Sequence, residues 1–256
     1  MIGIFDSGIG GLTVVKELLR QAPDVSFVYL GDTARTPYGN KSAEVVRQYA
    51  LEDAQFLIDQ GATSIIIACH TASALAEQSL RESFPKIPIF GMIHQTVDAA
   101  LALKPKHLGV IGTRATIGSN VYPAVLKEMG VKKIAVQQVA CPLFTVLAEE
   151  GLLDDQVTKL VAKKYLSGFR AHPLDVLIMG CTHYPLLRAV IQHAVTKRTT
   201  LIDPAQVTVA HILNVLPDIE RTKKQVFFLS DVASHTVQIA TKWMGKKIEF
   251  EKAVLQ

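Results

Sequence analysis

The sequence predicts an α/β protein made of two related halves, each with a mostly parallel sheet. Short apolar runs alternate along the chain with amphipathic stretches, which is the pattern of strands and covering helices in such sheets. The runs are unbroken, as expected for strands buried on both faces. Two of them end alike, with a small residue, a cysteine and polar residues, which indicates an internal repeat.

Nine apolar runs are predicted strands. They cover residues 2–5, 27–30, 65–68, 89–90, 108–111, 134–139, 176–179, 201–202 and 226–229. Helical spacing between them is clearest at residues 12–19, 44–60 and 121–129.

The internal repeat centres on two cysteines. Residues 65–71 read Ile-Ile-Ile-Ala-Cys-His-Thr, and residues 177–183 read Leu-Ile-Met-Gly-Cys-Thr-His. A shorter echo links residues 29–33 with 110–113. Because ligands of such sheets bind outside the carboxyl ends of the strands, two facing halves would place Cys69 and Cys181 across one cleft.

The repeat predicts two domains. We expect residues 1–93 plus 206–256 to form the first, which carries Cys69, and residues 94–205 to form the second, which carries Cys181. The chain then crosses near Ile93 and returns near Pro204. No low-complexity linker marks either crossing, so the connections should allow hinge motion but not free tethering.

Composition predicts a packed chain and excludes several classes. Of the 256 residues, 49% are hydrophobic and 20% charged, which disfavours disorder. The net charge of +4 lies in scattered pairs such as Lys163-Lys164, typical of solvated surface and not of a nucleic-acid interface. Neither a signal peptide nor a membrane span is expected. Three widely spaced cysteines fit neither a disulfide framework nor a zinc cluster, so we expect a cytoplasmic location.

The matched cysteines point to acid–base chemistry. Two such groups on opposite faces of a carbon, one deprotonated and one protonated, can remove a proton and return another. A thiol can be tuned toward neutral pH, and a following helix N-terminus favours its thiolate. A single cysteine is as readily a small buried hydrophobe, but the pair favours chemistry. Cys141, followed by Pro142, is assigned to packing.

Further candidates lie near the other strand ends. Asp6 and Ser7 begin a segment with three glycines, whose backbone N–H groups suit a carboxylate better than a nucleotide. Asp6 is placed to orient a thiol or to accept an ammonium group, with helix capping as the alternative for both residues. Tyr38 and Gly39 offer a hydroxyl and a close backbone approach, or an ordinary turn. His183 is suited to share a proton with Cys181.

Five motifs in order make the chain resemble the glutamate racemases of the aspartate/glutamate racemase superfamily over nearly its whole length. They are Phe-Asp-Ser-Gly-Ile-Gly-Gly at 5–11, Tyr-Leu-Gly-Asp-Thr-Ala-Arg-Thr-Pro-Tyr-Gly at 29–39, Ala-Cys-His-Thr-Ala-Ser-Ala at 68–74, Cys-Pro-Leu-Phe at 141–144 with Glu-Glu-Gly at 149–151, and Gly-Cys-Thr-His-Tyr-Pro-Leu-Leu at 180–187. The last is typical of the glutamate branch.

The resemblance implies two pseudo-symmetric, flavodoxin-like α/β domains with the active site in the cleft between them. It implies an isomerase that interconverts L- and D-glutamate without pyridoxal phosphate, other cofactor or metal. It also implies a supply of D-glutamate for peptidoglycan, and hence a part in cell wall biogenesis and cell shape. Homodimers are the assembly that the family suggests.

The family pattern also implies residue roles. Cys69 would take the α-proton of D-glutamate with help from Asp6, and Cys181 that of L-glutamate with help from His183. One of Glu149 and Glu150 would contribute. The residues implied to contact the substrate are Asp6, Ser7, Tyr38, Gly39, His70, Thr71, Thr182 and His183.

His70 departs from the pattern, because the family usually has asparagine after the first cysteine. Histidine is bulkier and can be charged, so it would either donate a hydrogen bond to the substrate or, if protonated, favour the Cys69 thiolate. We predict that His70→Asn keeps or raises activity.

Three alternatives remain open. The first is a related enzyme acting on another acid, such as an aspartate racemase or a decarboxylase; the second cysteine and the motif around it argue against these. The second is a hydrolase with one cysteine nucleophile, which would leave the pair unexplained. The third is a non-catalytic binding protein with the same cleft.

Overall fold

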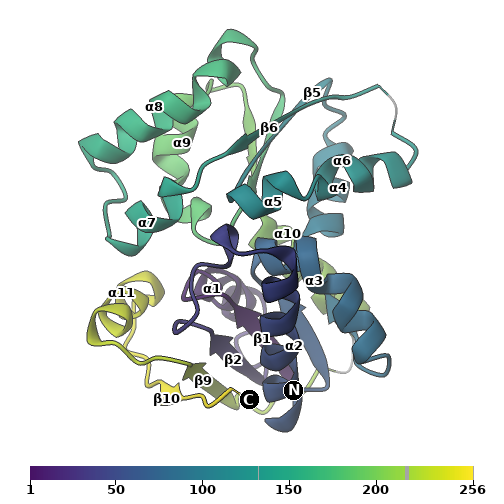
Figure 1. Cartoon of the computed structure of the whole chain (residues 1–256), viewed down its shortest axis with the longest axis vertical. Helices are drawn as coiled ribbons and strands as arrows, with labels where there is room; N and C mark the ends of the chain where they lie inside the picture. Colours follow the sequence, from purple (N-terminus) through teal and green to yellow (C-terminus); the bar gives the residue numbers. More distant parts are fainter. Residues whose placement is uncertain (132, 217–218, 256) are drawn as a thin grey trace.

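The molecule has two lobes, each built around one parallel sheet (Figure 1). The computed structural model describes residues 1–131, 133–216 and 219–255. One sheet has six strands in the order β10-β9-β2-β1-β3-β4, and the other has four in the order β6-β5-β7-β8. Every strand pairing in the described chain is parallel, which confirms the predicted α/β class.

All nine predicted strands are present, with ends that differ by no more than one residue. The strands are β1 (Ile2–Asp6), β2 (Phe27–Gly31), β3 (Ser64–Ile67), β4 (Ile89–Phe90), β5 (His107–Gly112), β6 (Ala135–Ala140), β7 (Val176–Gly180), β8 (Thr200–Ile202), β9 (Gln225–Leu229) and β10 (Glu251–Lys252). Strand β10 was not predicted, because its two residues are exposed at the sheet edge and form no apolar run.

Helices cover both faces of each sheet, and the three predicted helices correspond to α1, α2 and α6. The α-helices are α1 (Leu12–Gln21), α2 (Ala43–Asp59), α3 (His70–Ser83), α4 (Ile93–Ala102), α5 (Arg114–Gly118), α6 (Val121–Glu128), α7 (Leu143–Glu149), α8 (Gln156–Ala171), α9 (Arg188–Ala194), α10 (Pro204–Val215) and α11 (Ser234–Met244). Two short 3-10 helices, η1 (Tyr38–Asn40) and η2 (Tyr184–Leu187), lie at strand-end loops.

The two sheets share one arrangement of four strands. The order β2-β1-β3-β4 in the first lobe matches β6-β5-β7-β8 in the second. Cys69 follows β3 and Cys181 follows β7, so the cysteines occupy equivalent places. The shorter echo between residues 29–33 and 110–113 was wrong as evidence of repetition. It pairs β2 with β5, whereas the counterpart of β5 is β1.

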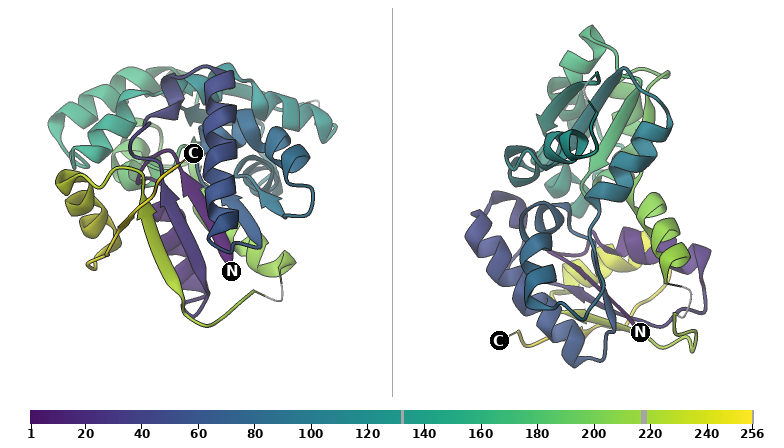
Figure 2. Two further views of the ribbon diagram at one scale, coloured as in Figure 1. Left: turned by 60° about the horizontal axis from the view of Figure 1, so that its bottom comes forward. Right: turned by 90° about the vertical axis from the view of Figure 1, so that its right-hand side faces the viewer.

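The chain passes between the lobes twice, and α4 and α10 lie at the crossings (Figure 2). These helices contact each other; α4 also packs on β7 and β8, and α10 packs on α1. One buried apolar cluster joins side chains of β1 and α1 to side chains of α7 and β7. The domain limits at residues 93 and 206 are still a prediction. The strands do divide as expected, with β5 to β8 in one sheet and the strands before and after them in the other.

None of the helices in the described part of the chain combines the length and apolar character needed to cross a membrane.

Candidate active site

A small cavity lies where the carboxyl ends of the two sheets meet. Its lining comes from both lobes and includes both matched cysteines, as the repeat predicted. The lining residues are Ser7, Thr36, Pro37, Gly39, Cys69, His70, Thr71, Thr113, Thr145, Cys181, Thr182 and His183.

Topology explains the place of the cavity. The strand order reverses between β1 and β3 in the first lobe and between β5 and β7 in the second. Ligands of parallel sheets bind at such switch points. The pairing of β1 with β3 aligns Phe5 with Ile67, which brings the loop after β1 beside Cys69. Cys69 Sγ accordingly lies 3.5 Å from Ser7 Oγ, to which it donates a hydrogen bond.

The Cys69 thiol is neutral in this enclosed site. Burial raises the pKa of Cys69 to about 12, and the negative charge of Asp6 adds to the effect. Hydrogen bonds with Ser7 and with the backbone of Ala72 oppose it only in part. Helix α3 does begin directly after Cys69, as expected, but its dipole does not bring the thiol to a neutral pKa, because the loss of hydration is the larger effect.

Cys181 has a different electrostatic setting. The expectation that it stands before a helix N-terminus was wrong, because η2 begins only at Tyr184 and α9 only at Arg188. Its sulfur instead lies 3.7 Å from Nδ1 of His183 and 3.7 Å from Oγ1 of Thr145. A positive charge beside this sulfur would come from the imidazole and not from a helix.

His183 has surroundings that favour its charged form. Its Nε2 lies 3.0 Å from Oε1 of Glu149 on α7. Burial by itself lowers the pKa of His183, but the contacts with Cys181 and Glu149 outweigh burial and raise the pKa well above its usual value. A cationic imidazole next to a thiol favours the thiolate. Glu149 is the member of the Glu149–Glu150 pair that reaches the site, while Glu150 is exposed.

Asp6 is fully buried and connects the lobes. Its carboxylate accepts hydrogen bonds from the backbone N–H of Gly8 at 3.1 Å and from Thr182 Oγ1 at 3.2 Å. Burial raises the pKa of Asp6, against the positive charge of His183 and the hydrogen bond from the Gly11 N–H. The glycine segment therefore does hold a carboxylate, but it is that of Asp6. Helix α1 is capped by Gly11, so neither Asp6 nor Ser7 is its cap.

The Tyr38 side chain does not lie where the sequence placed it. Its hydroxyl lies between the carboxyl groups of Asp32 and Asp53, away from the cavity, so the phenol is not a cavity group. Gly39 does line the cavity. A Cβ atom at Gly39 would come within 3.0 Å of Thr113 of the other lobe, which explains the need for glycine there.

His70 lines the cavity as a neutral side chain. It is 2% exposed, and neither ring nitrogen has a hydrogen-bond partner among the described residues. Burial lowers the pKa of His70 to about 3. The charged alternative is therefore wrong near neutral pH. A neutral imidazole keeps one donor and one acceptor, as the amide of asparagine would.

Threonines complete the lining, and some of them were not predicted from the sequence. Thr71 Oγ1, on α3, lies 2.9 Å from Oγ1 of Thr113 in the other lobe. Thr113 directly follows β5, as Ser7 follows β1, so the strand symmetry would have found it. Nothing in the sequence singled out Thr145, whereas Thr36 and Pro37 lay in a loop already flagged for binding. Cys141 is fully buried against the core, as its assignment to packing predicted.

Among the described residues, no group of three or more His, Cys, Asp or Glu side chains is arranged to bind a metal ion.

The chain is an α/β protein of two lobes with a cysteine at the equivalent strand end of each, and residues 9–212 match the model of the Asp/Glu/Hydantoin racemase family. The chain belongs to that family, and within it to the glutamate racemases, as the motifs indicated. A glutamate racemase of Geobacter metallireducens is 42% identical over 254 residues, which cover 96% of this chain and 93% of the relative.

Solved structures of glutamate racemases also resemble this chain. The glutamate racemase isoform RacE1 of Bacillus anthracis has a TM-score of 0.94 at 34% identity, covering 100% of this chain and 97% of its own. The glutamate racemase of Francisella tularensis, solved in complex with D-glutamate, has a TM-score of 0.91 at 35% identity, covering 99% of this chain and 97% of its own.

Proposed function

We propose that this protein interconverts L- and D-glutamate with neither organic cofactor nor metal: one of Cys69 and Cys181 removes the α-proton, and the other donates its own proton to the opposite face. The observation that carries the proposal is the unequal pair of thiols in one cavity. Burial keeps Cys69 protonated, while the Cys181 sulfur lies beside the His183 imidazole. Proton transfer on two faces of a carbon needs one acid and one base, and this pair supplies them.

In the proposed reaction, the Cys181 thiolate takes the α-proton of L-glutamate, which becomes a carbanion. The Cys69 thiol then gives its proton to the opposite face, and D-glutamate leaves. The reverse reaction starts from the Cys69 thiolate and the Cys181 thiol. Asp6 would act on Cys69 through its charge, which adds to the effect of burial on the pKa of that thiol.

The proposed substrate contacts are Asp6, Ser7, Gly39, His70, Thr71, Thr182 and His183, together with the backbone at Tyr38. Glutamate is favoured over aspartate because the relatives named above are glutamate racemases, and one of them was solved with D-glutamate. A cytoplasmic supply of D-glutamate for peptidoglycan, by a homodimer, is the cellular role that we propose.

The test follows D-glutamate in deuterated water. We expect the parent protein to exchange the α-hydrogen and to form L-glutamate, and to turn over aspartate more slowly. Cys69→Ser and Cys181→Ser should each lower inversion by at least about 100-fold, the usual value of a positioned acid or base. Cys141→Ser is the matched control, because that thiol is buried outside the cavity. Full inversion by either of the first two variants, or none by the parent, contradicts the proposal.

A further inference from the structure

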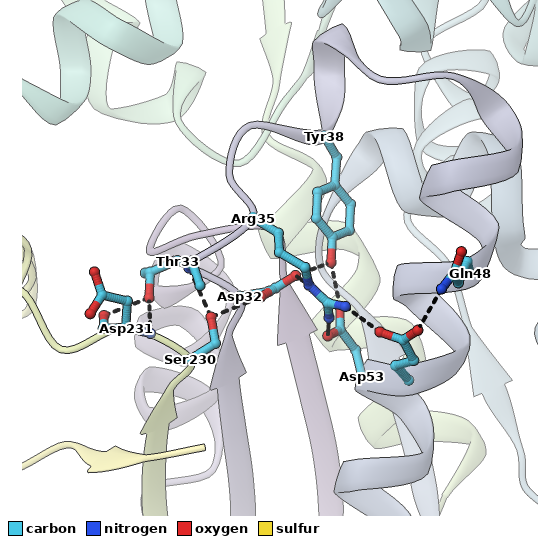
Figure 3. A network of polar contacts seen from close by, with 10 residues as sticks. Asp32, Thr33, Arg35, Tyr38, Gln48, Asp53, Ser230 and Asp231 are labelled. Atoms are coloured by element: carbon cyan, nitrogen blue, oxygen red, sulfur yellow. Dashed lines mark hydrogen bonds and ion pairs between the residues drawn. The ribbon is translucent and has the colours of Figure 1, made fainter. Parts of the chain in front are cut away.

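The loop after β2, residues 32–39, forms one wall of the cavity. Thr36, Pro37 and Gly39 face the cavity. The side chains of Arg35 and Tyr38 extend instead towards Asp32 and Asp53, and Asp53 lies on α2 (Figure 3). The buried contacts behind the loop therefore set where the wall stands.

Arg35 and Tyr38 each contact both Asp32 and Asp53. Arg35 Nε lies 2.6 Å from Asp32 Oδ2, and Arg35 Nη2 lies 3.0 Å from Asp53 Oδ1. The Tyr38 hydroxyl lies 2.8 Å from Asp53 Oδ2 and also contacts Asp32 Oδ2. Asp32, Tyr38 and Asp53 are fully buried, so these contacts are shielded from bulk solvent.

The hydrogen atoms in this cluster are too few if every carboxyl group is ionised. A phenol carries one hydrogen, yet its oxygen contacts two carboxyl oxygens. The phenol hydrogen can make one linear hydrogen bond, so a second one needs a hydrogen on a carboxyl group. Asp32 already accepts from Arg35 and, at 2.8 Å, from Ser230 Oγ. Among the described residues, Arg35 is the one other hydrogen-bond partner of Asp53 besides the phenol, so Asp53 is the better place for the proton.

Charge balance leads to the same residue. Among the described groups facing the cluster, Arg35 is the one cation set against Asp32, Asp53 and the half-buried Glu52, with which it also pairs. Lys41 reaches only the ring of Tyr49, whose own ring lies against the Arg35 guanidinium. Burial, and then the charge of Asp32, raise the pKa of Asp53 well above its usual value.

We infer that Asp53 is a protonated carboxylic acid at neutral pH, which donates a hydrogen bond to Tyr38 Oη while Tyr38 donates to Asp32. Asp53 is then a positioning residue: it holds the loop that brings Thr36 and Gly39 to the substrate. The inference about activity rests on the proposed racemisation, whereas the location of the proton does not.

Two variants at one position separate the protonated form from the ionised form. An asparagine at 53 can donate to Tyr38 through its amide nitrogen and accept from Arg35 through its oxygen, like the neutral acid. We expect Asp53→Asn to keep KM for glutamate within about twofold, and Asp53→Ala to raise KM about tenfold with kcat less affected, because buried partners lose their hydrogen bonds. Asp59→Asn and Asp59→Ala, at an exposed site on the same helix, are the matched controls.

Infrared spectroscopy tests the proton directly. The difference spectrum between parent and Asp53→Asn at pH 7 should contain the C=O stretch of a protonated carboxyl group, while Asp6 is common to both proteins and cancels. A difference spectrum with only ionised carboxylate bands overturns the inference, as does an Asp53→Asn variant impaired as much as Asp53→Ala. If the parent does not racemise glutamate, the proposed function fails, but the infrared result still decides the state of Asp53.

Discussion

At position 70 a buried imidazole takes the place that the family usually gives to asparagine. Because the pKa of His70 lies at about 3, the side chain is neutral throughout the range of enzyme assays. We therefore expect His70→Asn to keep or raise kcat/KM and to leave the pH profile unchanged. Steady-state rates from pH 6 to pH 9 would measure this. A complete loss of activity in a folded variant would refute it.

Glu149 contacts His183, which in turn contacts the Cys181 sulfur, so we expect Glu149 to act on that thiol through His183. It is one of the two contacts that raise the pKa of His183, so Glu149→Gln should lower that pKa. His183 would then lose its proton at a lower pH in the variant than in the parent. The alkaline limb of the pH profile of kcat/KM should therefore move to lower pH. Glu150→Gln, at the adjacent exposed carboxylate, is the control. An alkaline limb that moves equally in both variants would contradict this role.

At the scale of elements, the contact between the cavity loop and α2 should make stability depend on pH. The pKa of Asp53 is higher in the folded than in the unfolded chain, so its contribution is complete below the unfolded value of about 4. It is lost as the pH rises toward the folded value.

Asparagine at 53 does not titrate. The unfolding free energy of Asp53→Asn, relative to the parent, should therefore increase with pH above about 4, with a slope of up to about 1.4 kcal/mol per pH unit. Urea unfolding at a series of pH values measures the difference. The same series on Asp59→Asn, where the carboxyl group is exposed, should show no such trend, and a flat difference for Asp53→Asn would exclude the linkage.

For the whole molecule, the close approach of the lobes limits side-chain size at their contact. A Cβ atom at Gly10 would lie closer than 3.0 Å to Thr182 and His183 of the other lobe. Overpacking of this kind costs about 1–3 kcal/mol. Gly10→Ala should therefore hold the lobes apart, lower kcat/KM by roughly tenfold or more and increase the radius of gyration in X-ray scattering. Gly118→Ala, with no atom within 4 Å, is the control and should change neither quantity.

Sequence patterns were sufficient to predict the strands and the equivalent positions of Cys69 and Cys181. A buried parallel strand needs an unbroken apolar run whatever its neighbours are, so β1, β3 and β7 can be read from their own residues. The cysteines could be paired because equal strand ends lie at equal places in repeated sheets. The exposed edge strand β10 has no such run and was missed.

Only the tertiary structure decided three features of the site. They are the direction of the Tyr38 phenol, the choice between Glu149 and Glu150, and the neutral state of His70. Each depends on residues distant in the sequence: Asp53 for Tyr38, His183 for Glu149, and the surrounding core for His70. The hydration and charge of a side chain depend on its neighbours in the folded protein. Those neighbours are distant in the sequence, so a local pattern does not predict them. Residue types and their order thus indicated which groups to propose as reactive, while burial and contacts between distant residues determine the charge on side chains such as His70 and His183.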